Sequence, residues 1–273
     1  MRPDRETIAA PDLPEQIAWI GEAPRSMPVL TAAGPVLVHF FDFAQLNSVR
    51  TLPYLIEWAR RYREAGLRVI GVQAPRFPFG AEPGVVAVGL ERLGVDFPVA
   101  IDGQRDLWHT YGCEGWPSLF LWKTGGALSW FHFGEGEYLG TEMAIAAELR
   151  EEDALRELPA PLDPLRPSDG PNARVMPPTP ELFPGGSWEQ AWVAGEDGEE
   201  LETAYEAAGA YATVEGEGLI EVVLDGATAG SIEVPGPGLY PLAEHPVHEQ
   251  HDISLRPSPG LRVWSLSFAA GVP

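Results

Sequence analysis

A proline-rich stretch just past the middle of the chain sets the strongest limit on how this sequence can fold. Nine prolines fall between Pro159 and Pro184, interspersed with serine, aspartate, glycine and asparagine. Proline has no backbone N–H to donate and disfavours helix at the residue before it, so neither a helix nor an inner strand can run through this stretch. We therefore predict an extended linker over residues 153–184 that separates two domains.

Before the linker, short apolar runs alternate with stretches of helical periodicity. The strand and helix alternation ends in a hairpin and a final helix, which predicts an α/β domain with a mixed sheet flanked by helices over residues 1–152, including an N-terminal extension. The expected strands are 35–41, 67–72, 97–101, 118–122 and 127–133, and the expected helices are 48–65, 84–93, 104–111 and 141–149.

After the linker, short strand-forming runs are separated by turn residues, of which Asp225 and Gly226 form the strongest turn signal. This spacing is typical of an all-β sandwich, which we place at residues 185–273. The expected strands are 210–214, 219–224, 231–234, 251–255 and 262–268.

The charge balance excludes two classes of partner. The chain has 18 basic and 40 acidic side chains, for a formal net charge of -22. Phosphate backbones and anionic membrane surfaces repel such a chain, so we expect neither nucleic acid nor membrane as a partner. No apolar run approaches the roughly 20 residues of a membrane helix, and the first 14 residues, charged at positions 2, 4, 5 and 6, lack the apolar core of a secretory signal. The expected location is the cytoplasm.

Cys113 is the single cysteine of the chain. No intramolecular disulfide, Cys-x-x-Cys pair or cysteine-rich zinc site can form within it. Chemistry by an internal dithiol is therefore excluded.

The first domain resembles thioredoxins, in particular the thioredoxin-like domain of the TlpA/DipZ (AhpC/TSA-like) type, over about residues 14–150. The segments that carry this resemblance are 36–41, 50–55, 71–75 with Phe77 and Phe79, 93–102, 111–117 and 131–138. DipZ proteins have a jelly-roll β-sandwich similar to a carbohydrate-binding module after this domain. Residues 179–181, 224–226, 239–240 and 264–268 look like its landmarks.

The resemblance breaks at the positions where the family performs redox chemistry. Thioredoxins place Cys-x-x-Cys at the start of the first long helix, where the helix dipole lowers the pKa of the leading thiol. Counting back from the helix proline, Pro53, these positions hold Gln45, Leu46, Asn47 and Ser48, and the buried acid of the preceding strand corresponds to His39. The resemblance thus implies a former redox site without redox activity.

Other features of the first domain have two interpretations each. Pro117 matches the family's cis-proline, and the residue before it, Trp116, would then offer its backbone to an extended peptide, although the proline could instead only preserve the fold. We interpret Cys113 as a thiol that packs in the core, and the alternative is a reactive thiol. Ser48 with His39 upstream lacks the orienting third group of a catalytic triad, so we interpret Ser48 as a helix cap.

Two groups in the second domain offer alternatives to a purely structural role. A concentration of metal-ligand residue types has neither helical nor recognised turn spacing, so we predict a solvated strand connection and no metal site. Exposed aromatic side chains could stack on sugar rings, and the alternative, favoured for Trp264, is that they fill the core. The first group is Glu244, His245, His248, Glu249, His251 and Asp252, and the second is Trp188, Trp192, Tyr205 and Trp264.

These observations favour a redox-inactive, thioredoxin-fold protein without a cofactor, which acts by binding a peptide, protein or small ligand at the former active-site cleft. One alternative is a thiol-dependent oxidoreductase or peroxidase that uses Cys113. The other is a carbohydrate-binding module carried on an inert thioredoxin scaffold.

Overall fold

The computed structural model describes residues 8–24, 26–196 and 198–273; the N-terminal charges at positions 2, 4, 5 and 6 lie outside these ranges. The chain divides into two compact units. The first comprises the residues up to Phe43 with Asn47–Asp163, and the second comprises Ala44–Leu46 with Pro164–Pro273. The boundary after Asp163 falls inside the segment that we predicted as the linker.

The first unit is built on a six-stranded mixed sheet with the strand order β1-β4-β3-β2-β5-β6. The central strand β2 has all six residues buried, as expected for an apolar run that pairs on both sides. It is parallel to β3 and antiparallel to β5. The strands are β1 (Ala18–Ile20), β2 (Val36–Phe41), β3 (Arg68–Gln73), β4 (Val99–Ile101), β5 (Ser118–Trp122) and β6 (Leu128–Phe133).

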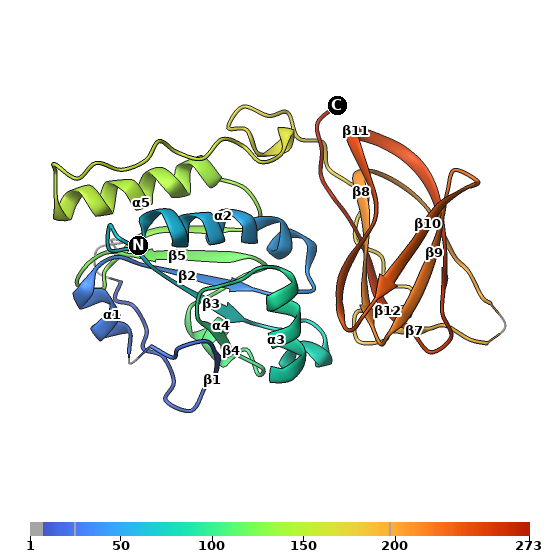
Figure 1. Ribbon diagram of the computed structural model, residues 1–273, viewed down its shortest axis with the longest axis horizontal. Coiled ribbons are helices and arrows are strands. Elements are labelled where there is room, and N and C mark those ends of the chain that lie inside the picture. Colours follow the sequence, from blue (N-terminus) through green and yellow to red (C-terminus); the bar gives the residue numbers. More distant parts are fainter. Residues whose placement is uncertain (1–7, 25, 197) are drawn as a thin grey trace. The chain divides into compact units, whose positions relative to one another are not determined.

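Helices cover both faces of this sheet (Figure 1). On one face α2 and α5 lie side by side, and the rings of Tyr54 and Tyr138 stack between them at 3.8 Å. On the other face, Met27 of α1 and Leu107 of α4 join the core under the even-numbered residues of β2. The helices are α1 (Met27–Ala33), α2 (Leu46–Tyr62), α3 (Pro83–Arg92), α4 (Asp106–Thr110) and α5 (Tyr138–Glu152), with a 3₁₀ helix at Pro78–Ala81.

This arrangement is a thioredoxin fold, so the expected fold class is confirmed. Two elements, β1 and α1, were not predicted, because β1 is a three-residue edge strand and α1 is only seven residues long. Helix α2 begins at Leu46, two residues before the predicted start, and α5 extends three residues beyond its predicted range at each end.

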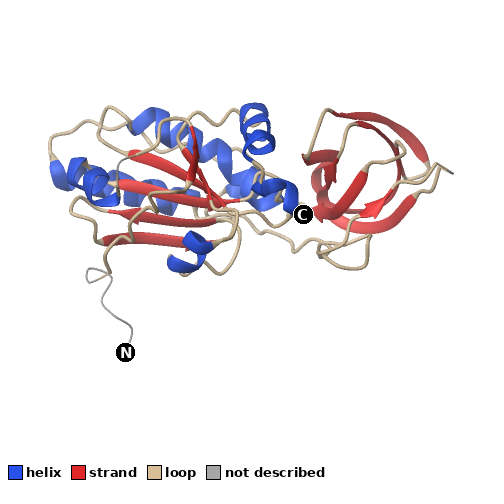
Figure 2. Ribbon diagram, turned by 90° about the horizontal axis from the view of Figure 1, so that it is seen from below, coloured by secondary structure: helices blue, strands red, loops and turns tan. Residues whose placement is uncertain are grey.

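The second unit is an all-antiparallel sheet with the strand order β10-β9-β11-β8-β12-β7, as predicted for its class. Figure 2 shows that this sheet curls strongly upon itself, so that its concave side encloses an apolar core. The longest strand, β11, has register shifts between Pro241 and Ala243 and between Glu244 and Glu249. Such irregularities bend a strand. The strands are β7 (Trp192–Val193), β8 (Leu201–Glu215), β9 (Gly218–Leu224), β10 (Ala227–Val234), β11 (Gly238–Pro257) and β12 (Arg262–Phe268).

The proline-rich segment is tied down at both of its ends. Leu162 donates its backbone N–H to the buried carboxylate of Glu142 at 2.9 Å, within the first unit. Further along, Met176 and Leu182 donate backbone N–H groups to Gly271 and Leu266 of the second unit. A one-turn 3₁₀ helix at Pro167–Asp169 lies between these anchors.

No helix among the described residues is both long and apolar enough to cross a membrane.

Candidate functional site

The positions that we predicted to correspond to the redox turn lie at the start of α2. Gln45 immediately precedes the helix, and Leu46, Asn47 and Ser48 form its first turn. Ser48 is fully buried, and its hydroxyl oxygen accepts the backbone N–H of Asp42 at 3.2 Å. This bond points back to the residue after β2, so Ser48 fixes the junction between strand and helix rather than capping the helix.

Asp42 is the centre of a buried polar network at the carboxyl end of β2. Its carboxylate accepts the backbone N–H of Arg76 at 2.8 Å and the side-chain amide of Gln73 at 3.2 Å. The Gln73 carbonyl in turn accepts the backbone N–H of Phe43 at 3.0 Å. Because both Asp42 and Gln73 are buried, these bonds fix the loop that follows β3 against the start of α2.

Trp116, in the loop before β5, contacts the loop that follows β3. Its indole N–H donates to the carbonyl of Ala74 at 2.7 Å, its ring stacks on Trp108 at 5.2 Å, and the guanidinium of Arg76 lies 6.0 Å from its centroid. The peptide bond from Trp116 to Pro117 is cis. Within the described part of the chain, the backbone N–H and C=O of Trp116 have no hydrogen-bond partner. The loop before β5 therefore presents one residue whose main-chain N–H and C=O are unpaired within the described part of the chain.

His39, which we predicted to correspond to the buried acid of the family, is held in its neutral form. It is fully buried in β2, its ring stacks on Phe41 at 5.1 Å, and neither ring nitrogen has a hydrogen-bond partner among the described residues. Burial disfavours the charged imidazolium and lowers the pKa of His39 to about 3. No hydrogen bond joins it to Ser48, so the two do not form a nucleophile and base pair.

Cys113 lies in the apolar core of the first unit, with 6% of its surface exposed. Desolvation raises the pKa of its thiol to about 12, against the weaker lowering effect of a hydrogen bond with Ser118. A nucleophilic cysteine must be a thiolate, and this thiol stays protonated at neutral pH.

The aromatic side chains considered for sugar binding separate into two pairs. Tyr205 and Trp264 are buried, and the Trp264 indole N–H donates to Glu215 at 2.9 Å. The prediction that Trp264 fills the core is confirmed. Trp188 is 47% exposed, and Trp192 is half-buried against the core of the second unit.

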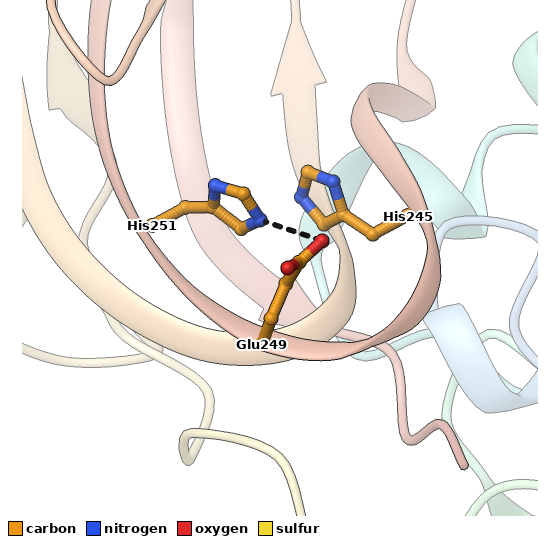
Figure 3. A group of neighbouring side chains, drawn as sticks. All are labelled: His245, Glu249 and His251. Carbon is orange, nitrogen blue, oxygen red and sulfur yellow. Dashed lines mark ion pairs between the residues drawn. The ribbon is translucent and has the colours of Figure 1, made fainter. Parts of the chain in front are cut away.

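Of the six metal-ligand residues in the second unit, the structure brings three together. His245, Glu249 and His251 each direct one donor atom into a group in which these atoms lie within 4.8 Å of one another (Figure 3). His248 instead lies 3.7 Å from Glu206. Spacing along the sequence did not indicate this convergence.

Sequence reasoning also missed Asp42, Gln73 and Arg76. A usable signal exists for the first two, because each ends or directly follows a buried strand and the two strands are parallel neighbours. Polar residues at the carboxyl ends of adjacent parallel strands lie at the edge where ligands bind in open α/β sheets. Arg76 carries no such signal.

Comparisons with known proteins agree with the expected resemblance. The chain is 28% identical over 300 residues to the protein DipZ of Mycobacterium tuberculosis, and equally to that of Mycobacterium bovis. The match covers 95% of this chain and 42% of DipZ, so the chain spans about two fifths of the length of these relatives. NHL repeat-containing protein 2 of Gallus gallus is 26% identical over 65% of this chain and 24% of its own length. No family model matches the chain.

Solved structures with thioredoxin-type names cover about half of the chain. A thiol-disulfide isomerase from Corynebacterium glutamicum has 24% identity and a TM-score of 0.44, covering 51% of this chain and 96% of its own. A thioredoxin-like superfamily protein has 22% identity and a TM-score of 0.46, covering 56% and 100%. Along most of its length the chain is similar to DipZ, and its single cysteine excludes the Cys-x-x-Cys pair of thioredoxins.

Proposed function

We propose that this DipZ-like chain with a thioredoxin fold is inactive as a disulfide oxidoreductase and acts by binding an extended peptide segment beside α2. The observation that carries the first half is the absence of any thiol at the start of α2, where Gln45 and Ser48 occupy the two cysteine positions. The remaining thiol, Cys113, is buried and protonated.

The second half of the proposal rests on Trp116. Its unpaired backbone lies next to a rigid frame, because its side chain is bonded to Ala74 and its neighbour Arg76 is fixed by Asp42. A main-chain N–H and C=O presented in this way can pair with the backbone of an extended peptide. The main-chain hydrogen bonds that form provide the affinity. A frame that is already ordered keeps the entropy cost of binding low.

Insulin reduction in the presence of dithiothreitol tests the redox half. The expected rate equals that of dithiothreitol alone, for the wild type and for Cys113→Ala. Acceleration by the wild type that disappears in Cys113→Ala would contradict the proposal and favour the thiol-dependent enzyme.

A phage-displayed library of random linear peptides tests the binding half. Peptides selected on the full chain should shift the backbone amide resonances of Ser48, Arg76 and Trp116, and Trp116→Ala should weaken their binding at least tenfold. Trp188→Ala, an exposed tryptophan of the second unit, is the matched control and should leave the affinity unchanged. Selected peptides that shift none of these three resonances would refute a peptide site beside α2.

A further inference from the structure

The second unit contains a cluster of donor atoms at the irregular part of β11. Pairing of β11 with β8 is interrupted between Glu244, opposite Gly209, and Glu249, opposite Ala207. The four residues between them therefore bulge out of the ladder, since only one residue of β8 faces them. This bulge turns His245 back toward Glu249 and His251, and Figure 3 shows the two imidazole rings and the carboxylate converging.

His251 is held in the orientation of a metal ligand. Its Nδ1 lies 2.7 Å from a carboxylate oxygen of Asp225, and the other oxygen of Asp225 accepts the backbone N–H of Asp252 at 2.9 Å. A carboxylate only accepts hydrogen bonds, so Nδ1 carries the proton. A carboxylate behind the outer ring nitrogen is the arrangement that orients metal-binding histidines and makes the inner nitrogen more basic.

The inner nitrogen of His251 has no suitable protein partner. Its Nε2 is covered from solvent, has no hydrogen-bond partner among the described residues, and lies 3.5 Å from an oxygen of Glu249. In the neutral ring two lone pairs face each other across this gap. A cation between the two groups resolves the repulsion.

His245 supplies the second imidazole of the cluster. Its ring stacks on that of His251 at 3.8 Å, and its Nε2 lies 2.7 Å from the hydroxyl of the buried Tyr205. A metal ion can take one nitrogen from each of the two rings as a ligand. Donors of a tetrahedral zinc site lie about 3.4 Å apart. The three donor atoms here lie within 4.8 Å of one another, so small side-chain rotations bring them to the spacing of a zinc site.

We propose that His245, Glu249 and His251 bind a divalent transition-metal ion, with zinc as the expected metal, through two imidazole nitrogens and one carboxylate oxygen. Imidazole nitrogen selects zinc and similar late metals over calcium and magnesium, which prefer oxygen ligands only. Three protein ligands leave a fourth position open for water or for a group of a bound molecule. This site is independent of the peptide site proposed for the first unit.

Zinc titration of the chelator-treated full chain, against a chromogenic zinc chelator, tests the proposal. We expect one zinc ion per chain, and Glu249→Gln and His251→Gln should each weaken its binding at least tenfold. Asp225→Asn should weaken it by about 10 to 100-fold through the orientation of His251 alone. His109→Gln, an exposed histidine of the first unit, and His248→Gln, a neighbour outside the cluster, are matched controls that should keep wild-type affinity.

Cobalt provides a readout that surface binding does not give. Co²⁺ bound by two imidazoles and a carboxylate should produce visible absorption that is lost in Glu249→Gln, while circular dichroism shows that the variant remains folded. Zinc binding that is equally weakened by His109→Gln, or that survives in His251→Gln, would overturn the proposal. Absence of saturable zinc binding in the wild type would also overturn it.

Discussion

At the scale of single residues, packing and hydrogen bonds constrain two side chains that we predicted to lie at former redox positions, His39 and Ser48. His39 has no polar partner and stays neutral because burial penalises its charge. The hydroxyl oxygen of Ser48 accepts the backbone N–H of Asp42. Both side chains thus have structural roles in the first unit.

His39 makes folding stability depend on pH in a defined direction. Its pKa falls from 6.5 to about 3 on folding, so between these values the unfolded chain binds the extra proton and stability is lost as the pH falls. One pKa unit corresponds to about 1.4 kcal/mol, so between pH 7.5 and pH 5 the wild type should lose about 2 kcal/mol more than His39→Phe. Urea unfolding at both pH values measures this difference.

The matched control for that measurement is His109→Ala, which removes an exposed histidine. Its pH dependence should follow that of the wild type. A His39→Phe variant that loses as much stability as the wild type at pH 5 would show that His39 is not buried in the neutral form.

Cys113 offers a second test at this scale. Because its thiol is buried and its pKa is raised to about 12, iodoacetamide should leave the native chain unmodified at pH 8 and alkylate it fully in urea. Mass spectrometry measures the fraction modified. Rapid alkylation of the folded chain would restore the thiol-dependent enzyme as the better hypothesis.

At the scale of elements, we predict that the start of α2 has the geometry of a Cys-x-x-Cys turn without its cysteines. Gln45 and Ser48 stand three residues apart across the first turn, where free N–H groups and the helix dipole favour a negative charge. We expect Gln45→Cys with Ser48→Cys, in a Cys113→Ala background, to form an intramolecular disulfide in an oxidising buffer. The number of free thiols by mass spectrometry measures its formation.

Each single variant serves as the control for that pair and should retain one free thiol. Two free thiols in the folded double variant under oxidant would mean that this turn does not correspond to the Cys-x-x-Cys turn. The proposed loss of redox function by substitution would then lose its main support.

At the scale of the whole molecule, the proline-rich segment is anchored at Leu162 and Met176 and contains exposed residues between these two anchors. Trypsin should therefore cut first after Arg174, which is exposed, whereas Arg166 precedes a proline and resists cleavage. The expected products are residues 1–174 and 175–273, each stable to further digestion. Arg174→Gln should abolish this cut, and initial cleavage elsewhere would contradict the exposed segment.

Much of the architecture could be predicted from local pattern. The apolar run of β2 and the helical periodicity of α2 match the observed elements to within three residues at each end, and the strand segments predicted for the second unit lie within the observed strands. The short elements β1 and α1 were missed because three and seven residues carry too little periodicity. The length of β11 was underestimated because Pro241 and Pro246 interrupt its pattern, although the bulges accommodate them.

The sequence alone determined the two fold classes, the break between them and the absence of a dithiol, since each follows from residue types at neighbouring positions. Only the tertiary structure decided which polar groups meet. The network of Asp42 and Gln73 depends on two strand ends coming together in a sheet. The convergence of His245, Glu249 and His251 depends on a bulge set by pairing with β8. Sequence spacing reports the geometry of one element, whereas a site across elements depends on register, which long-range packing determines.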